Sequence, residues 1–350
     1  MEKRIKQCVG IDCGHKELVV AYGVMDEKFD VKILSNTTFR NQEKGFEQLL
    51  KWSKKLTEQG LEVTYVIEAT GVYYERVTLF LDQQSSKVSV LLPNKTKAFM
   101  KTLSVKTVND KVSAQMLAQM GLEKKLDAWQ APKKIFNDLR QLTRERDQLQ
   151  HEQTQVKNQL HAEQSGAWPN FQSIKRAQQR IRFLSKQIIE IENEIRTTVE
   201  NDTILKEKIK KVCTIKGVGL ITAVTIIAET NGFNLIKNKK QLVSYAGLDV
   251  ITKDSGTSVR SKPRISHKGN KYLRKCLHYP ALSAIRSTDT MKSLFKRLVS
   301  KHGIKMKAVV AVQRKMLELV YILWKKDETF DSEYHTKKKE FASANPCELA

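Results

Sequence analysis

Short apolar runs, bounded by glycine, proline or polar residues, recur through the first hundred positions of the chain. β-branched side chains are frequent in these runs, which favours strands over helices. Five such runs follow one another, at 9–12, 18–22, 31–34, 63–68 and 88–92. Between the third and fourth runs the apolar residues take a helical spacing from Phe46 to Leu56, and Asn41 is the expected helix cap. Residues 1–128 are therefore predicted to form an α/β domain.

Residues 129–204 change to a helical pattern in two arms. In the second arm, over 174–195, apolar residues step by three and four without a break. The first arm follows the same stepping over 135–160 with two polar interruptions, and Gly, Pro and Asn separate the arms at 166–170. This pattern predicts an antiparallel coiled-coil hairpin. The Lys, Arg and Gln residues on its outer faces fit a solvated surface, and they also fit dimerisation or nucleic-acid contact.

Residues 205–327 are predicted to form a mostly α-helical domain, followed by a poorly ordered polar tail over 328–350. An early turn of this domain carries Lys216, Gly217 and Gly219 and resembles the turn of a helix-hairpin-helix element. Glycines in such a turn let backbone N–H groups approach a DNA phosphate at a helix N-terminus. We therefore expect this turn to bind nucleic acid.

A basic loop with several glycine and serine residues spans 249–268. Nucleic-acid contacts are expected from basic residues in and just after this loop, namely Arg260, Arg264, His267, Lys268 and Arg274. Turn chemistry alone explains Asp254-Ser255-Gly256 as a simple turn. The other interpretation is a nucleophilic Ser255, because the surrounding cations would stabilise the negative charge on a phosphorus atom under attack.

The net charge of the chain indicates which class of partner the protein binds. Its 62 Lys and Arg residues against 38 Asp and Glu residues give a net charge of +24. Such a protein repels itself unless a polyanion neutralises it, so nucleic acid is the expected partner, with an acidic membrane surface as the competing explanation. No run approaches the length of a membrane span, and the first residues lack a signal peptide's apolar core. Five widely spaced cysteines, without a C-x-x-C pair, agree with a reducing compartment, and we expect a cytoplasmic protein.

Three acidic residues stand at the ends or at the start of predicted strands and helices of the first domain. Asp12 and Glu68 end apolar strands, and Asp110 stands at the start of a helix. Acids in such positions are typical of a two-metal phosphoryl-transfer site, where hard Mg²⁺ ions take oxygen ligands. The alternative is that they are solvated acids, with Asp12 serving the turn before Gly14.

The ordered set of motifs resembles the DEDD transposases of the insertion-sequence one-ten family, the RNA-guided bridge recombinases. The resemblance covers residues 7–325. Its motifs are Gly-Ile-Asp ending at Asp12, Glu-Ala-Thr-Gly at 68–71, Asn-Asp-Lys-Val at 109–112, Lys-Gly-Val-Gly at 216–219, Tyr-Ala-Gly-Leu at 245–248, Ser255-Gly256, and Ile-Ser-His-Lys-Gly-Asn at 265–270. No single motif is specific to this family, but the occurrence of all of them in this order along the chain is specific to it.

The resemblance implies a RuvC-like, or RNase H-like, fold for the first domain and assigns roles to matching residues. Asp12, Glu68 and Asp110 match three of four metal-binding acids, and Ser113 stands where the fourth acid is expected. A hydroxyl is a poorer Mg²⁺ ligand than a carboxylate, which puts the second ion in question. The resemblance also implies a serine nucleophile that forms a phosphoserine link to DNA, placed at Ser255, with Ser258 and Ser266 as alternatives.

The leading hypothesis is therefore a transposase that moves an insertion sequence by RNA-guided, site-specific strand exchange. The family likeness implies donor and target DNA, a structured guide RNA, and a homodimer that pairs into a tetramer. A covalent serine link conserves the phosphodiester energy, so no ATP is needed. The alternative is a RuvC-like Mg²⁺-dependent endonuclease without a covalent intermediate. A non-enzymatic reading is a basic scaffold that packages nucleic acid.

Overall fold

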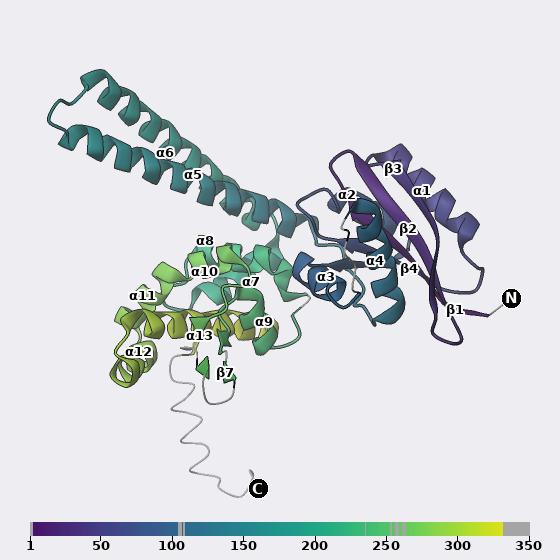
Figure 1. Ribbon diagram of the computed structural model, residues 1–350. Coiled ribbons are helices and arrows are strands. Elements are labelled where there is room, and N and C mark those ends of the chain that lie inside the picture. The colour runs from purple at the N-terminus through teal and green to yellow at the C-terminus, as the bar shows by residue number, and fades with distance from the viewer. Residues whose placement is uncertain are drawn as a thin grey trace, which may run out of the picture. The chain divides into compact units, whose positions relative to one another are not determined.

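The computed structural model describes residues 3–103, 107, 109–234, 236–252, 254–255, 259–260 and 264–331 (Figure 1). The chain divides into two compact units, which we call unit 1 (Met1–Ala131) and unit 2 (Pro132–Ala350). Each unit is described by itself below. Ser258 and Cys347, together with most of the predicted tail, lie outside the described residues.

Unit 1 is built on a mixed sheet in the strand order β3-β2-β1-β4-β5. The strands are β1 (Arg4–Cys13), β2 (Glu17–Asp26), β3 (Val31–Arg40), β4 (Val63–Glu68) and β5 (Lys87–Leu91). The first three pair antiparallel, whereas β4 runs parallel to both β1 and β5. The helices are α1 (Glu43–Leu56), α2 (Glu75–Gln83), α3 (Pro93–Met100) and α4 (Asp110–Glu123). All five predicted strands are thus present, and the expected α/β class of this domain is confirmed.

Alternation along β1 separates two apolar layers. Val9 and Ile11 pack into one core with residues of α1 and α2, while Cys8 packs into a second core with residues of α4. Successive side chains of a strand point to opposite faces, so the helices cover both sides of the sheet. Gly10 lies on the same face as Cys8, where α4 crosses the strand.

The predicted cap of the first helix is wrong. Helix α1 begins at Glu43, and its N-cap is Gln42 rather than Asn41. The Nδ2 atom of Asn41 instead donates to the carbonyl oxygens of Gly14, at 2.9 Å, and Tyr73, at 3.0 Å. Asn41 therefore joins two loops that are distant in sequence, a role that local helix-start signals do not reveal.

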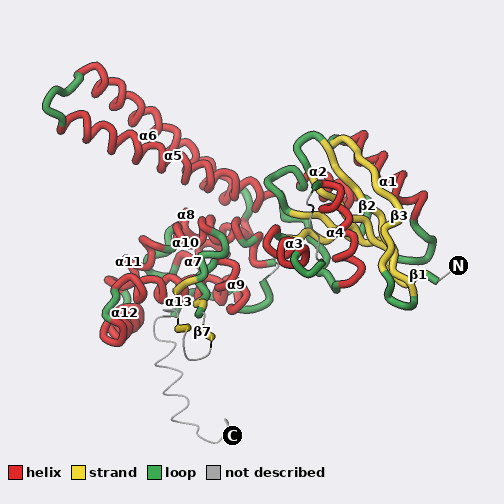
Figure 2. The backbone as a smooth tube through the Cα atoms, in the orientation of Figure 1, coloured by secondary structure: helices red, strands yellow, loops and turns green. Residues whose placement is uncertain are grey.

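Unit 2 begins with two long helices, α5 (Lys134–Ser165) and α6 (Phe171–Glu200), which lie along each other (Figure 2). Val156, Ala177 and Leu184 are buried where the helices meet. The predicted helices are present and are joined at the predicted break. Supercoiling of the pair into a coiled coil stays a prediction.

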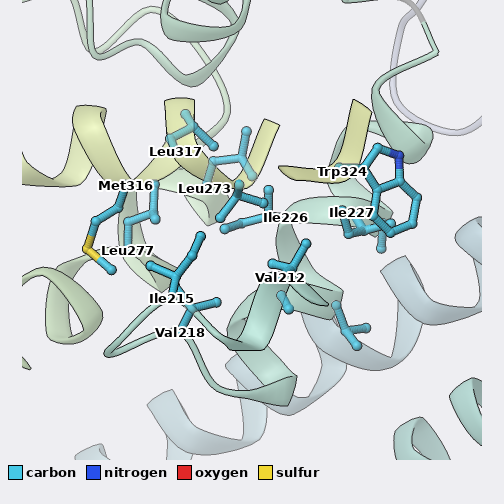
Figure 3. Packing of buried hydrophobic residues seen from close by; sticks show 14 of the residues in the cluster. Val212, Ile215, Val218, Ile226, Ile227, Leu273, Leu277, Met316, Leu317 and Trp324 are labelled. Atoms are coloured by element: carbon cyan, nitrogen blue, oxygen red, sulfur yellow. The ribbon is translucent and has the colours of Figure 1, made fainter. Parts of the chain in front are cut away.

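The remainder of unit 2 is mostly helical. Its helices are α7 (Thr203–Cys213), α8 (Leu220–Glu229), η1 (Asn231–Phe233), α9 (Lys239–Ala246), α10 (Lys271–Cys276), α11 (His278–Ser287), α12 (Asp289–His302) and α13 (Lys305–Lys326). Between α9 and α10, the described residues include four two-residue strands, namely β6 (Val250–Ile251), β7 (Asp254–Ser255), β8 (Val259–Arg260) and β9 (Arg264–Ile265). Ile226 and Ile227 of α8 belong to the same buried core as Leu273, Leu317 and Trp324 (Figure 3). Leu139 of α5 joins this same core.

The described helices include none that is long and apolar enough to cross a membrane. Four cysteines of the described chain, Cys8, Cys13, Cys213 and Cys276, are free thiols.

Candidate functional site

Two of the predicted acids stand side by side on neighbouring strands of unit 1. The parallel pairing of β1 and β4 aligns Ile11 with Ile67, and the next residue on each strand is an acid, Asp12 and Glu68. Residues in register on parallel strands point to the same face. Ile11 and Ile67 face the core under α1 and α2, so both acids face the opposite side, which α4 covers.

Helix α4 brings the third acid to the same place. A Cβ atom at Gly10 would overlap the backbone of Ala114 and Ala118, so the glycine lets the helix lie directly on β1. Gly121, further along α4, packs against Cys8, so the helix runs opposite to the strand. Asp110 is one turn before Ala114 and therefore lies toward the end of β1, where Asp12 stands.

The electrostatics of Asp12 agree with this arrangement. Its pKa is raised to about 6, chiefly because the carboxyl group is partly buried, and further because Asp110 and Glu68 repel its charged form. A backbone hydrogen bond from Cys13 lowers the pKa and offsets part of this effect. The structure therefore brings Asp110 and Glu68 close enough to Asp12 to disfavour its charged form.

Glu68 is held in place by two hydroxyl donors. Thr70 donates to its Oε1 atom at 2.9 Å, and Thr96 donates to its Oε2 atom at 2.5 Å. Asn109 caps helix α4 by accepting a hydrogen bond from the backbone N–H of Val112, which fixes the first turn that carries Asp110. Neighbouring hydroxyl groups thus orient the carboxylate of Glu68, whereas the side chain of Asp110 is exposed on a helix turn whose backbone is capped.

This site suits a hard divalent cation by its chemistry. Its ligands are carboxylate oxygens, and their mutual repulsion would be relieved by a positive charge between them. Among the described residues, however, no three His, Cys, Asp or Glu side chains already form a closed metal-binding group. Ser113, which is predicted to stand at the position of a fourth acid, lies on the first turn of α4 and is half-buried.

Ser255 belongs to unit 2, so the proposed nucleophile and the acids come from separate folded units. It lies in β7, which pairs antiparallel with β8, so that Ser255 is opposite Val259 and Asp254 is opposite Arg260. The first alternative nucleophile, Ser258, lies outside the described residues.

The second alternative, Ser266, has a defined environment. Its hydroxyl donates to the Oδ1 atom of Asp249 at 2.5 Å, and its backbone N–H donates to the Asp249 carbonyl oxygen at 2.8 Å. These bonds continue the β6–β9 ladder, in which Val250 pairs with Ile265. Ser266 therefore stands at the base of the loop that carries Ser255.

The predicted nucleic-acid contacts divide into exposed and packed residues. Four basic side chains are exposed, those of Lys216, Arg264, His267 and Lys268. Arg274 is half-buried, and its guanidinium donates to the carbonyl oxygen of Ala246 at 2.8 Å.

The two glycines of the predicted helix-hairpin-helix turn also differ. Gly217 has a φ of +93°, and a Cβ there would lie 2.6 Å from the carbonyl oxygen of Pro280, so this glycine is required by packing against α11. Gly219 is the N-cap residue of α8, with open space around its Cα. The local pattern did not distinguish the packed glycine from the open one.

An ion pair between an exposed arginine and a buried acid of unit 2 was not predicted. Arg144 of α5 donates from Nε and Nη2 to the two carboxylate oxygens of Glu229, at 2.6 and 2.9 Å. Asn270 donates to the same carboxylate at 2.5 Å, and the Tyr245 hydroxyl donates to the Glu229 carbonyl oxygen. The Glu229 side chain is 1% exposed. A single acid ending the apolar stretch of α8 was the one sequence signal for this network.

Two family models match the chain. The first, described as a transposase of the DEDD type in the IS110 group, matches residues 9–169. The second is described as "Transposase IS116/IS110/IS902 family" and matches residues 209–296. Together they span most of the chain and include the three acids and the loop with Ser255.

Among curated proteins, the chain is 26% identical over 301 residues to the pilin gene-inverting protein of Moraxella bovis, covering 86% of this chain and 92% of that protein. It is also 28% identical over 128 residues to the transposase for insertion sequence element IS1111A of Coxiella burnetii, covering 35% of each chain.

Among solved structures, Thermus thermophilus RuvC matches with 13% identity and a TM-score of 0.28, covering 35% of this chain and 99% of RuvC. A Ppx/GppA family member of Aquifex aeolicus covers 97% of this chain and 99% of its own, at a TM-score of 0.23 and 11% identity. Scores this low do not establish a shared fold, so the RuvC-like assignment stays a prediction.

Proposed function

We propose that this chain, a DNA transposase or recombinase that matches two family models of IS110-type transposases, exchanges DNA strands through a serine-linked intermediate. The observation that carries the proposal is the gathering of Asp12, Glu68 and Asp110, whose charges act on one another, in a chain that also holds the basic serine loop. The match of the two family models, in the expected order, supports it further.

We assign divalent-metal binding to the acids of unit 1. Asp12, Glu68 and Asp110 would hold Mg²⁺, with Ser113 as a weaker neutral ligand. When bound, the ion would polarise a phosphoryl oxygen and neutralise developing negative charge. Thr70 and Thr96 hold Glu68 in one orientation, which reduces the reorganisation needed on binding.

The chemical step assigned to the serine is a phosphoryl exchange. The Oγ atom of Ser255 attacks a phosphorus atom of the DNA backbone, forms a P–O bond and loses its proton. The bond from phosphorus to one sugar oxygen breaks, and that oxygen takes up a proton and becomes a free hydroxyl. A hydroxyl on the exchanged strand then attacks the phosphoserine and releases the serine, so the phosphodiester count is unchanged.

The family likeness also supports a guide RNA and a shared active site. A net charge of +24 suits a protein that binds nucleic-acid backbones, while base pairing to an RNA would select the sequence. We assign Ser255 of one subunit to work with the acids of another within a dimer or tetramer. The exposed side chains of Lys216, Arg264 and Lys268 are the proposed backbone contacts.

The deciding experiment traps the intermediate. The full chain is incubated with Mg²⁺, RNA transcribed from the flank of its own element, and labelled donor and target DNA, and any adduct is mapped by mass spectrometry. A DNA-linked peptide containing Ser255, absent in Ser255→Ala, is the expected result. Mg²⁺-dependent cleavage without an adduct would instead support the alternative, a metal-dependent endonuclease.

Mixing two inactive variants tests whether subunits share a site. Asp12→Asn and Ser255→Ala should each be inactive alone. If one subunit supplies the acids and another the serine, the mixture should regain a measurable fraction of activity. No recovery in mixed oligomers, verified by differential tags, would place both groups in one subunit.

A further inference from the structure

A cavity of about 310 Å³ opens where α5, α8, α10 and α11 meet, wholly within unit 2. No residue proposed above for catalysis lines it. Its wall combines apolar groups, such as Ile221 and Pro280, with polar ones, such as Thr222, and two tyrosines, Tyr272 and Tyr279. A volume near 300 Å³ with a few fixed polar groups is the size of a small-ligand site.

One wall of the cavity is held in place by hydrogen bonds to the buried carboxylate of Glu229. Glu229 fixes the guanidinium of Arg144 through two hydrogen bonds. The Arg144 Cζ atom lies 4.6 Å from the centre of the Tyr272 ring, a cation–π contact. Asn270 both donates to Glu229 and caps α10, the helix that carries Tyr272. The Arg144–Tyr272 pair therefore forms a preorganised flat surface.

The charges around the cavity are already paired. Arg144 is paired with Glu229, Arg146 with Glu192, and Lys275 with Asp147. A bare anion would find no uncompensated cation among these three groups. A planar, mostly neutral ring that stacks and accepts a few hydrogen bonds fits this wall better.

The mouth of the cavity carries an exposed aromatic ring. Tyr279 is 78% exposed, and the edge contact of its ring with His278, at a centroid distance of 5.4 Å, leaves most of the ring open to solvent. Unstacked bases of single-stranded nucleic acid are commonly held on aromatic rings and on the planes of Arg side chains. A chain of net charge +24 would bring such a strand to this surface.

We propose that this cavity binds one unstacked nucleotide of a single-stranded nucleic acid, its base lying between Tyr279 and the Arg144–Tyr272 surface. This inference rests on the proposed function only for the presence of a nucleic-acid partner. It adds a recognition site at the base of the helical hairpin, apart from the acids and the serine. The strand is either the guide RNA or a displaced DNA strand, two sources that share this chemistry.

Photocrosslinking tests the site directly. The full chain is irradiated with a short single-stranded oligouridine carrying one 5-iodouridine, and in a parallel arm with the corresponding deoxyuridine strand. The expected result is a crosslink in the peptide that contains Tyr272 and Tyr279. A crosslink with the RNA probe alone would identify an RNA strand, and one with both probes would identify a site that does not read the sugar.

Binding measurements with matched variants complete the test. Tyr279→Ala should weaken binding of the oligouridine about tenfold, whereas Tyr279→Phe should retain most of it, because a stacked ring supplies the interaction. Phe183→Ala is the control, since Phe183 is also an exposed aromatic residue, 60% exposed, on α6. Thermal unfolding should be the same for all three variants.

Three results would overturn the inference. Crosslinks that fall elsewhere while the strand still binds would show that the cavity is not the site and would leave the proposed function standing. Equal losses in Tyr279→Ala and Phe183→Ala would show a general surface effect. Failure of the chain to bind any nucleic acid, duplex DNA included, would instead contradict the proposed function together with this site.

Discussion

The acids of unit 1 stand on regular elements, whereas the serine of unit 2 stands on a two-residue strand. Asp12 lies on a ten-residue strand, and Asp110 opens a fourteen-residue helix that packs on that strand. Within the described residues, Ser255 lies in the two-residue strand β7, which pairs with the equally short β8. Rigid neighbours can hold carboxylates close together against their repulsion, while a short ladder contributes few hydrogen bonds of its own.

This difference shows that the acids and the serine obtain their geometry in different ways. The acids are placed by backbone packing, above all by the contact of Gly10 with α4. The serine loop is anchored at its base by the β6–β9 ladder and by the hydrogen bonds of Ser266 to Asp249. Changes in unit 1 should therefore affect folding and catalysis together, and changes in the serine loop should affect catalysis with little effect on folding.

The largest effect is expected for Gly10→Ala. The new methyl group would overlap the backbone of Ala114 and Ala118, so α4 must move away and carry Asp110 with it. Overpacking against backbone costs about 3 kcal/mol in the free energy of unfolding, and Mg²⁺-dependent strand cleavage should fall below detection. Urea unfolding and a cleavage assay measure the two effects.

Gly166→Ala is the matched control for that variant. A Cβ there meets nothing closer than 3.5 Å, at the Glu163 carbonyl oxygen, so its stability should stay near that of the wild type. A Gly10→Ala protein that unfolds at the wild-type urea concentration would contradict the proposed packing of the acid site.

The pH dependence of Asp12 gives the next prediction. The pKa of Asp12 in the folded chain is about 6, above the ordinary value of 3.8. Between these two pH values, the folded chain therefore keeps a proton on Asp12 that the unfolded chain has released. Without metal, Asp12 therefore favours folding at low pH, and this contribution is lost as the pH rises through 6. Asp12→Asn should raise the melting temperature at pH 8 and leave it almost unchanged at pH 4.

The affinity of the site for Mg²⁺ should rise with pH, whereas the stability contribution of Asp12 without metal falls with pH. A cation requires the ionised carboxylate, so Mg²⁺ affinity should rise about tenfold per pH unit below pH 6 and level off above it. Melting curves with and without Mg²⁺, at several pH values, measure this in the wild type and in Asp12→Asn. The same Mg²⁺ stabilisation in both proteins would remove Asp12 from the site.

The sequence predicted the strands of unit 1, the positions of two acids and the two helices of the hairpin, because each of these features depends on a local pattern. Alternating or continuous apolar runs placed the five strands, and the strand-terminal positions of Asp12 and Glu68 placed the acids together. The two helices of the hairpin followed from three-and-four spacing. These signals are local in the sequence, and the fold preserves them.

The features that were missed depend on tertiary contacts. Asn41 has the residue type of a helix cap, but the structure uses its amide to join the loops at Gly14 and Tyr73. Glu229 pairs with Arg144, 85 residues earlier in the chain, and no periodicity reports such a pair. Residue type alone cannot show which of two possible partners a side chain takes.

The turn before α8 provides a sharper comparison within unit 2. Gly217→Ala should destabilise unit 2 by about 1–3 kcal/mol, because the positive φ and the contact with Pro280 both exclude a side chain. Gly219→Ala meets no atom and should leave stability within about 0.5 kcal/mol. If the turn binds DNA phosphate, Gly219→Ala should still weaken duplex binding several-fold.

Fluorescence anisotropy with a DNA duplex and urea unfolding separate these two roles. The prediction for DNA contact fails if Gly219→Ala binds the duplex as tightly as the wild type. The prediction for packing fails if Gly217→Ala is as stable as Gly219→Ala.

A modest effect is expected for Ser266→Ala, and this variant decides which of two serines is the nucleophile. If Ser266 only anchors the base of the loop, Ser266→Ala loses its hydroxyl bond to Asp249, destabilises unit 2 by about 1 kcal/mol and slows adduct formation a few-fold, with the adduct still on Ser255. Ser266→Thr, which keeps a hydroxyl, should recover most of that rate. A nucleophilic Ser266 would behave differently, because the Asp249 carboxylate would then accept the proton of the attacking hydroxyl. In that case Ser266→Ala abolishes the adduct, Ser255→Ala does not, and the DNA-linked peptide contains residue 266.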